Sequence, residues 1–236
     1  MAEIKDYQLF INGEWRTSTS GETIDIVSPS TEEIVARVQN GTAEEALETL
    51  EHADKAQKEW KKLPARSRAD LLYKLADEIE AKTEYLAELL TKEQGKLLKV
   101  ARFEVAVAAS FIRYACEGAR RIEGDIIPSD NENEQIWIQK VPRGVIVAIT
   151  AWNFPFALAG RKLGPALVAG NTIVIKPTSE TPLATLELGN LANKVGIPAG
   201  VLNILTGPGR AMGNALVESP ITKMVTMTGS TPVGQS

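Results

Sequence analysis

Apolar and polar residues follow two different periods in the second part of the chain. Residues 145–149 (V-I-V-A-I) form an unbroken apolar run, which is typical of a strand that is buried on both faces of a sheet. Residues 172–175, 201–205 and 224–227 predict three further strands, with apolar residues at helical spacing between them. Thr181, followed by Pro182, predicts the N-cap of the helix after residues 172–175. Because short strands that alternate with helices form right-handed βαβ units, we expect an α/β fold with a Rossmann-like parallel sheet.

The first part of the chain has the pattern of amphipathic helices with a few short strands. Residues 9–11 are apolar and precede Asn12 and Gly13, a pair that favours a hairpin because both turn positions need positive φ. Thr42 and Glu45 have the spacing of a capping box and predict the start of a helix.

Two more helices and one strand complete this first part. Apolar residues at helical spacing predict one helix that ends near Gly95, and they are Leu72, Leu75, Ile79, Leu86 and Leu90. A third helix covers roughly residues 100–119, and residues 136–138 (I-W-I) predict a strand. The first part is therefore expected to be helix-rich.

Composition places the chain among ordinary globular proteins. It has 236 residues, of which 44% are hydrophobic and 24% are charged, and it can bury a core in one or two domains. Residues 1–140 carry a charge balance of −8, whereas residues 141–236 carry +4 together with 12 of the 18 Gly and 9 of the 12 Pro. We therefore predict a helical segment over 1–140 and a second, incomplete domain over 141–236.

The same counts exclude several classes of function. The net charge of −4 gives no basis for nucleic-acid binding, no apolar run reaches membrane-spanning length, and residues 1–5 lack the layout of a secretory signal. The single Cys116 cannot form an internal disulfide, which fits a reducing, cytoplasmic compartment. One Cys and one His are too few ligands for a zinc site, so no metal is expected.

Polar residues follow the predicted strands, where a parallel sheet binds its ligands. Asn153 lies just before a helix start, where its amide can donate to an oxyanion or can cap the helix. Lys176 follows the second strand, where it can donate to the ribose or pair with the 2′-phosphate of a dinucleotide, or can stay solvated. Position alone leaves these alternatives open.

Two glycine-containing turns follow the third and fourth strands. Residues 207–213 have the pattern G-x-G-x-x-x-G, in which Gly209 and Gly213 are candidate contacts for a dinucleotide, although ordinary glycine-rich turns have the same pattern. The later stretch T-G-S-T places Gly229 and Ser230 before a helix start. Ser230 can cap that helix or contribute to a phosphate site at its N-terminus.

Together these stretches resemble the aldehyde dehydrogenase superfamily. Their order and spacing agree along essentially the whole chain, so the combined signal is highly specific. The resemblance rests on residues 151–155 (A-W-N-F-P), 164–167 (G-P-A-L), 170–172 (G-N-T), 176–177 (K-P), 227–231 (M-T-G-S-T), 10–15 (F-I-N-G-E-W) and 28–32 (S-P-S-T-E). Within the superfamily the chain is similar to bacterial lactaldehyde and glycolaldehyde dehydrogenases, with succinate-semialdehyde dehydrogenases near.

The resemblance implies the oxidation of a small aldehyde to its acid with NAD or NADP. A cysteine thiolate would attack the carbonyl, hydride would pass to the nicotinamide, and a water activated by glutamate would hydrolyse the thioester. Asn153 would help to bind the oxyanion, Lys176 would bind the adenosine ribose, and Ser230 would contact the pyrophosphate. Three further residues would line the cofactor cleft, namely Ile149, Thr150 and Trp152.

Two positions depart from the family pattern. The family often has Pro where this chain has Ala151, and members that prefer NAD often have Glu three residues after the lysine, where this chain has Ser179. A carboxylate at that position repels a 2′-phosphate, whereas a serine can donate a hydrogen bond to one. We therefore expect Ser179 to contact the cofactor and NADP to be tolerated or preferred.

The nucleophile that the resemblance requires is missing, because in the family it lies well beyond the T-G-S-T motif, as does the general base. We interpret Cys116, which lies among apolar residues of the third helix, as a structural thiol, and His52 as a surface residue. By comparison with the family, the catalytic domain and at least one strand are absent. We expect an N-terminal portion that is inactive alone.

The substrate and the assembly are expected only in outline. Arg161 lies seven residues after Phe154 on the same helix face, where it can meet a small polar aldehyde or a structural partner. The strand near residues 136–140 matches a segment that family members use in assembly, which implies a homodimer or homotetramer at full length. A non-catalytic module that binds a dinucleotide or a partner, and a succinate-semialdehyde dehydrogenase as parent, stay open as alternatives.

Overall fold

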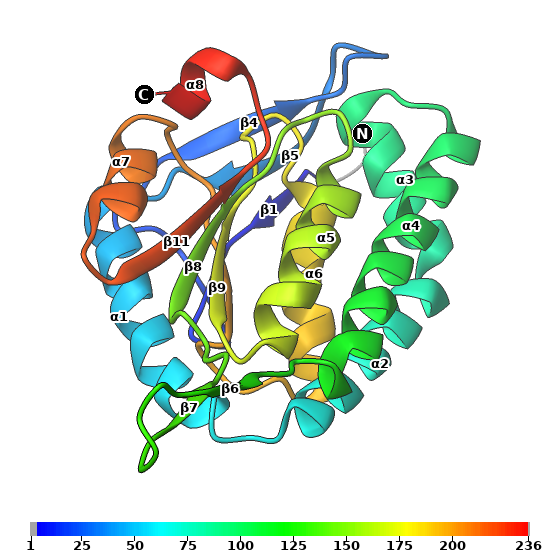
Figure 1. The fold of residues 1–236 in the computed structure, drawn as a ribbon. Helices are drawn as coiled ribbons and strands as arrows, with labels where there is room; N and C mark the ends of the chain where they lie inside the picture. Colours follow the sequence, from blue (N-terminus) through cyan, green and yellow to red (C-terminus); the bar gives the residue numbers. More distant parts are fainter. Residues whose placement is uncertain (1–3, 236) are drawn as a thin grey trace.

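A six-stranded sheet forms the centre of the fold (Figure 1). The structure is a computed structural model, and it describes residues 4–235. Along this sheet the strands follow the order β11-β8-β9-β10-β2-β3. In chain order the strands are β2 (Leu9–Ile11), β3 (Glu14–Arg16), β8 (Val145–Ile149), β9 (Thr172–Lys176), β10 (Leu202–Ile204) and β11 (Thr222–Met227).

The strands β8 to β11 run parallel and confirm the predicted Rossmann-like sheet. β8 pairs with β9 on one side and with β11 on the other, so the chain reverses its direction of progress across the sheet at β8. In the register, Ile149 lies opposite both Lys176 and Met227. Parallel sheets bind ligands outside the carboxyl ends of their strands at such a reversal. A ligand is therefore expected at the loops that follow these three residues.

Helices cover both faces of this sheet (Figure 1). α1 (Ala43–Trp60) and α7 (Ala211–Glu218) lie on one face. On the other side lie α2 (Ala65–Ala81), α3 (Thr83–Gln94), α4 (Leu98–Glu117), α5 (Pro155–Val168) and α6 (Leu183–Val195), and the short helices are η1 (Gly118–Arg120) and α8 (Thr231–Gln235). None of the helices within residues 4–235 has both the length and the apolar character that a membrane span needs.

Strand β8 contributes to two hydrophobic cores, one on each face of the sheet. Val145 and Val147 are buried with residues of α1 and α7, whereas Ile146 and Ala148 are buried with residues of α4, α5 and α6. Successive side chains of a strand point to opposite faces. The unbroken apolar run therefore corresponds to a strand that is covered on both sides, as predicted.

A hairpin from the N-terminal part of the chain extends the sheet. Asn12 (φ 53°) and Gly13 (φ 79°) form the tight turn between β2 and β3, which confirms the predicted hairpin. Phe10 of β2 pairs with Ile204 of β10 in antiparallel orientation. The N-terminal part therefore contributes strands to the same sheet as β8 to β11. The division of the chain near residue 140 stays a prediction.

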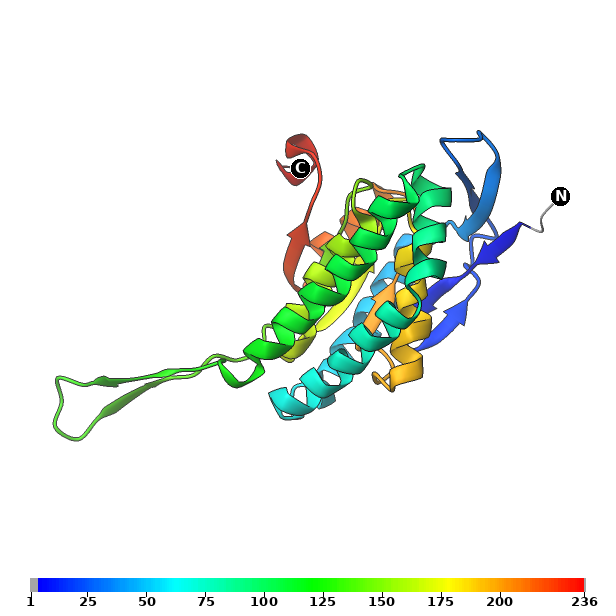
Figure 2. The ribbon, with the colours of Figure 1, turned by 90° about the vertical axis from the view of Figure 1, so that its right-hand side faces the viewer.

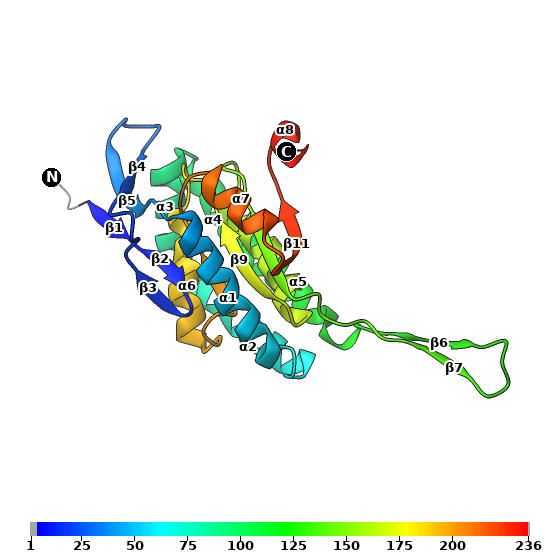
Figure 3. The same cartoon turned by 90° about the vertical axis from the view of Figure 1, so that its left-hand side faces the viewer.

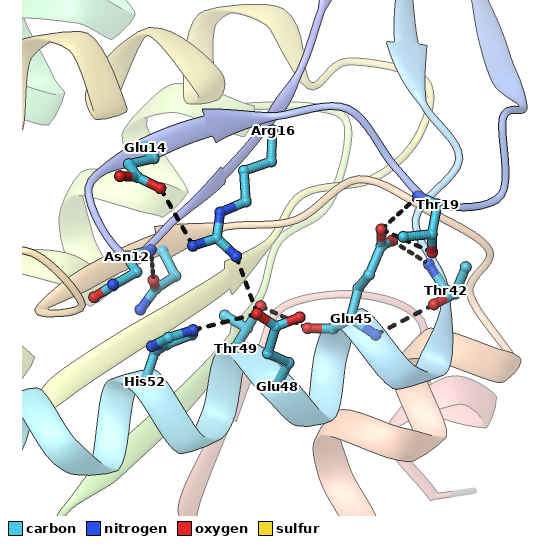
Figure 4. Close-up of polar contacts among 10 residues, drawn as sticks. Asn12, Glu14, Arg16, Thr19, Thr42, Glu45, Glu48, Thr49 and His52 are labelled. Carbon is cyan, nitrogen blue, oxygen red and sulfur yellow. Dashed lines mark hydrogen bonds and ion pairs between the residues drawn. The ribbon is translucent and has the colours of Figure 1, made fainter.

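Local signals define some helix ends and not others. The capping box at the start of α1 is confirmed, since Glu45 N–H donates to Thr42 Oγ1 (3.2 Å) and Thr42 N–H donates to Glu45 Oε2 (2.9 Å) (Figure 4). The single helix predicted from residue 72 to residue 90 is wrong, because α2 ends at Ala81 and α3 begins at Thr83. The apolar spacing continues across this break, so the break has no signal in the hydrophobic pattern.

Two smaller sheets complete the fold. The first follows the order β1-β5-β4, with β1 (Lys5–Tyr7), β4 (Thr23–Val27) and β5 (Ile34–Gln39). The second is a two-stranded arm of β6 (Asp125–Pro128) and β7 (Gln135–Ile138), which projects away from the body of the molecule (Figures 2 and 3). The arm exposes a set of large apolar side chains, namely Ile126, Ile127, Ile136, Trp137 and Ile138.

Candidate functional site

The loops that follow β8, β9 and β11 meet at the carboxyl edge of the parallel sheet. Thr150 N–H donates to the Lys176 carbonyl (3.3 Å), and Thr228 N–H donates to the Ile149 carbonyl (3.0 Å). Ile149 is half-buried at this edge, and Trp152 is 58% exposed in the loop that follows. The structure therefore brings together the residues that the sequence places at the ends of separate strands.

Lys176 is buried at this edge without a partner. The residue is 6% exposed, and its ammonium group has no hydrogen bond or ion pair with any residue in 4–235. Burial lowers the pKa of its ammonium group. The hydroxyl of Thr150 nearby is also buried and has no partner within the described residues. Because an unpaired buried polar group is costly, this edge fits a ligand that supplies hydrogen-bond acceptors.

Ser179 lies in the loop that follows β9. Its hydroxyl donates to the Gly207 carbonyl at 3.2 Å and so links this loop to the one that follows β10. The hydroxyl oxygen keeps its capacity to accept a hydrogen bond. Ser179 is half-buried, whereas Glu180 is exposed. Ser179 therefore lies in a loop at the carboxyl edge of the sheet, where its hydroxyl donates to a backbone carbonyl of this chain, and its contact with the cofactor stays a prediction.

The two glycine-containing stretches differ in exposure, since Gly209 and Gly229 are exposed whereas Gly213 is buried in the first turn of α7. A Cβ atom added at Gly209 or at Gly213 would meet no atom within 4 Å, so no neighbour within residues 4–235 demands a glycine there. Gly229 and Ser230 are exposed, and the Ser230 carbonyl accepts a hydrogen bond from Gly234 N–H (3.1 Å). A Cβ atom added at Gly229 would meet Met227 Cε at 2.6 Å, so the exposed open position is the one at Gly209.

Asn153 lies in the loop between β8 and α5 and is exposed. Its side chain makes no hydrogen bond with a described residue, and α5 begins after Phe154 without a side-chain cap from its own loop. Asn153 therefore does not cap α5. The amide of Asn153 is free to donate to a ligand at the carboxyl edge.

The cap of α5 comes from α4 instead. Glu104 Oε1 accepts hydrogen bonds from Phe156 N–H (2.9 Å) and Ala157 N–H (3.2 Å). Glu104 is fully buried and forms an ion pair with Lys96. Neither residue was predicted from the sequence, although a single acidic residue within the apolar face of a helix is a signal that could have identified Glu104.

A second remote carboxyl group, that of Glu93, caps α6. The predicted cap was Thr181, but its hydroxyl is buried without a partner, and the prediction is wrong. Glu93 at the end of α3 accepts from Leu183 N–H (2.6 Å) and Ala184 N–H (3.2 Å). Burial raises the pKa of Glu93 to about 8, and the negative charge of Glu104 adds to that increase.

Arg161 and Lys162 lie beside a cavity between α5 and β11. The cavity has a volume of about 510 Å³, and Leu158 and Thr226 also line it. Lys162 Nζ donates to Thr226 Oγ1 (3.1 Å). The Arg161 guanidinium lies 5.5 Å from the centre of the Phe111 ring and has no carboxylate partner within residues 4–235. It is exposed and can therefore meet a polar ligand.

The single cysteine and the single histidine lie away from this edge. Cys116 Sγ donates to the Ala69 carbonyl (3.6 Å), and burial raises the pKa of the thiol to about 12. His52 lies on α1 beside Glu48 (3.3 Å), which also binds Arg16 (Figure 4). No group of three or more His, Cys, Asp or Glu that could hold a metal occurs in the described part of the chain.

Comparison with protein families gives one match. The profile of the aldehyde dehydrogenase family matches residues 15–236. A 3,6-anhydro-alpha-L-galactose dehydrogenase of Vibrio sp. (strain EJY3) is 63% identical over 232 residues, which are 98% of this chain and 48% of the relative. A lactaldehyde dehydrogenase of Escherichia coli (strain K12) is 40% identical and covers 97% of this chain and 48% of the relative.

Comparison with solved structures gives the same result. The structure of a 3,6-anhydro-L-galactose dehydrogenase in complex with NAP superposes with a TM-score of 0.96 at 62% identity. The match covers 98% of this chain and 48% of that one. The chain therefore spans about half the length of the curated relatives that it matches.

Proposed function

The chain belongs to the aldehyde dehydrogenase family, and we propose that it is the cofactor-binding half of an enzyme that oxidises a small polar aldehyde to its acid. Homologues in this family use NAD or NADP. The observation that carries the proposal is Lys176, a buried ammonium without a partner at the edge where parallel sheets bind nucleotides. A ribose with free hydroxyls supplies the acceptors that this ammonium lacks.

The other residues at the edge take the roles that the family pattern implies. In this proposal Ile149, Thr150 and Trp152 line the cleft beside the nicotinamide, which accepts hydride when the cofactor is bound. In this proposal the phosphate groups lie against Gly209, Gly213, Gly229 and Ser230, of which Gly213 is buried in α7 and the other three are exposed. The open space at Gly209 supports this role, because backbone without side chains lets a pyrophosphate approach closely.

In this proposal the side-chain amide of Asn153 donates a hydrogen bond to the oxygen of the aldehyde. This oxygen gains negative charge when a nucleophile attacks the carbonyl, and donors that are fixed beforehand stabilise that charge. The free amide of Asn153 at the start of α5 supports the role. The cysteine nucleophile and the glutamate base belong, in this proposal, to a part of the protein outside these 236 residues, so the chain alone is inactive.

Ser179 bears on the choice between NAD and NADP. We propose that NADP is used, because Ser179 stands where a carboxylate would repel a 2′-phosphate. The relative that was solved in complex with NAP supports this choice. A KM for NADP at least about tenfold below that for NAD is expected, and a strong preference for NAD would refute the proposal.

The substrate is a small hydroxylated aldehyde in this proposal. The relatives named for 3,6-anhydro-galactose and for lactaldehyde both support it. Arg161, exposed beside a cavity and without a carboxylate partner, offers a donor for a hydroxyl or carboxylate of the substrate. Arg161→Ala should therefore raise KM for polar aldehydes more than for apolar ones, and an equal effect on both would remove Arg161 from the substrate site.

Assembly through the arm of β6 and β7 is also part of the proposal, as a homodimer or homotetramer in the reducing cytoplasm. A non-catalytic dinucleotide-binding module is the second candidate, and a succinate-semialdehyde substrate is a third. Turnover by the full-length protein separates the enzyme from the module, since the module would bind a cofactor without turnover. The rates with succinate semialdehyde and with a small hydroxylated aldehyde separate the two substrates.

Cofactor binding by the chain itself tests the central claim. Titration calorimetry with NADP and NAD should detect binding to the 236-residue protein, and Lys176→Ala should weaken it about tenfold or more. Lys55→Ala is the matched control, because Lys55 is exposed on α1, whose Ala53 carbonyl contacts the opposite end of β9 at Thr172. Equal binding by all three proteins would overturn the assignment of Lys176.

A further inference from the structure

The turn between α3 and α4 lies against the loop that carries Asn153. Gly95 ends α3 with φ 73°, a left-handed conformation that favours glycine. A Cβ at Gly95 would also meet Ser30 Oγ at 2.8 Å and Pro29 Cγ at 2.9 Å. The turn therefore has little freedom to move, and its neighbours Gln94 and Lys96 project from a fixed backbone.

Gln94 and Lys96 donate hydrogen bonds to carbonyl groups of the loop that carries Asn153. Gln94 Nε2 donates to the carbonyls of Trp152 (2.5 Å) and Asn153 (2.7 Å). Lys96 Nζ donates to the Asn153 carbonyl at 3.1 Å. Two donors from outside the loop thus fix the peptide groups on both sides of the Asn153 Cα atom, and these peptide groups determine the direction of the side chain.

Lys96 connects this loop to the start of the next helix. Its ammonium pairs with the buried Glu104 and lies 4.3 Å from the centre of the Phe154 ring. Glu104 in turn holds the first N–H groups of α5, at Phe156 and Ala157. The Lys96 side chain is 10% exposed and that of Glu104 is 0% exposed. The pair is therefore shielded from water, where charge-assisted hydrogen bonds are strong.

We infer that Lys96 and Gln94 are positioning residues that aim the Asn153 amide at the oxygen of the aldehyde, with Glu104 as the anchor of Lys96. The inference rests on the proposed function of Asn153. Gln94 and Lys96 hold the carbonyls of the loop, and Glu104 holds the N–H groups at the start of α5. The backbone around Asn153 is therefore fixed while its side chain stays free to bind a ligand. That is the arrangement that preorganised oxyanion binding requires.

The experiment uses the full-length enzyme that contains this chain. Lys96→Met removes the charge and the donor and should lower kcat about 10- to 100-fold, because a small displacement of a catalytic group costs about that much. The Kd of the cofactor should change less than about twofold. Lys99→Met is the matched control, since Lys99 is an exposed residue of α4 that makes none of these contacts, and it should leave kcat unchanged.

A double-mutant cycle separates positioning from general damage to the fold. If Lys96 acts through Asn153, then Lys96→Met should lower kcat far less in an Asn153→Ala background than in the native enzyme. Lys96→Arg, which keeps the charge and the donors, should restore kcat in part. Independent, multiplicative effects of the two substitutions would overturn the inference.

A milder variant covers the case in which Lys96→Met fails to fold. Gln94→Met removes two hydrogen bonds without leaving a buried charge unpaired, and it should lower kcat about threefold to tenfold with the same dependence on Asn153. An unchanged kcat in Gln94→Met would remove Gln94 from the inference, and an unchanged kcat in a folded Lys96→Met would remove Lys96. An unchanged kcat in Asn153→Ala alone would instead refute the proposed role of Asn153.

Discussion

Glu93 and Glu104 are buried carboxyl groups, yet each faces two backbone N–H groups at the start of a helix. Burial of a carboxyl is unfavourable unless its oxygens are bonded, and helix starts offer unsatisfied donors. Each carboxyl group therefore gains the hydrogen bonds that its burial requires, and each helix start gains acceptors for its free N–H groups. The N–H groups at the starts of α5 and α6 are thus bonded without a side-chain cap from Asn153 or Thr181.

Glu93 makes stability depend on pH. Burial raises its pKa from 4.5 to about 8, so the folded protein holds this proton in a range where the unfolded chain has lost it. The folded state then binds more protons, and the free energy of unfolding should fall as pH rises from about 5 to about 8. Urea unfolding of the native protein and of Glu93→Gln at pH 6 and pH 8 measures this slope.

The matched control for this prediction is Glu180→Gln, which changes an exposed carboxyl in the loop before α6. It should keep the slope of the native protein, whereas Glu93→Gln should flatten it. A slope that is the same in all three proteins would mean that Glu93 does not hold a proton in the folded state.

At the scale of elements, local signals were sufficient wherever the partner lies within a few residues. The capping box of Thr42 and Glu45 and the turn of Asn12 and Gly13 need only adjacent residues, and both were predicted. The starts of α5 and α6 depend on carboxyl groups about 50 and 90 residues earlier in the chain, which no local pattern reveals. The candidate residues at the strand ends were found because strand ends can be read from apolar runs.

The arm of β6 and β7 allows a prediction at the same scale. Trp137 is 70% exposed, and it pairs across the arm with Ile126, which is 69% exposed. An isolated hairpin with an apolar face is marginal in water, so we expect this face to be covered by another copy of the protein. Trp137→Ser in the full-length enzyme should shift sedimentation velocity profiles toward smaller species at micromolar concentration.

Glu132→Ser offers the control for the arm, because Glu132 is an exposed polar residue between its two strands. It should leave the sedimentation profile unchanged. Profiles that agree between Trp137→Ser and the native enzyme would show that the arm does not hold the copies together.

At the scale of the whole molecule, the N-terminal hairpin and the parallel sheet form one unit. Asn203 is fully buried in β10; its Oδ1 accepts from Asn12 N–H (2.8 Å), and its Nδ2 donates to the Gly200 carbonyl (2.9 Å). This contact joins residues 191 positions apart. The hydrophobic pattern predicts the strands at residues 9–11 and 201–205 but not their pairing, because pairing across such a distance leaves no local pattern.

Asn203 tests how firmly the two parts are joined. Asn203→Ala leaves the Asn12 N–H without its acceptor and should lower the free energy of unfolding by about 1–3 kcal/mol. Asn214→Ala, an exposed position on α7, should change it by less than about 0.5 kcal/mol. Chemical denaturation followed by circular dichroism gives both values. Equal stabilities in the two variants would mean that Asn203 is not a structural link.

The segment from Glu93 to Glu104 has a consequence for dividing the molecule. A piece trimmed to residues 141–236 would keep four parallel strands but lose the carboxyl groups of Glu93 and Glu104, so α5 and α6 would begin with unsatisfied N–H groups. The loops after β8 and β9 would then lose their order together, because the contacts that hold α5 and α6 both come from the segment between Glu93 and Glu104. Transplanting this nucleotide-binding sheet into another protein would therefore require carrying the α3–α4 turn along with it.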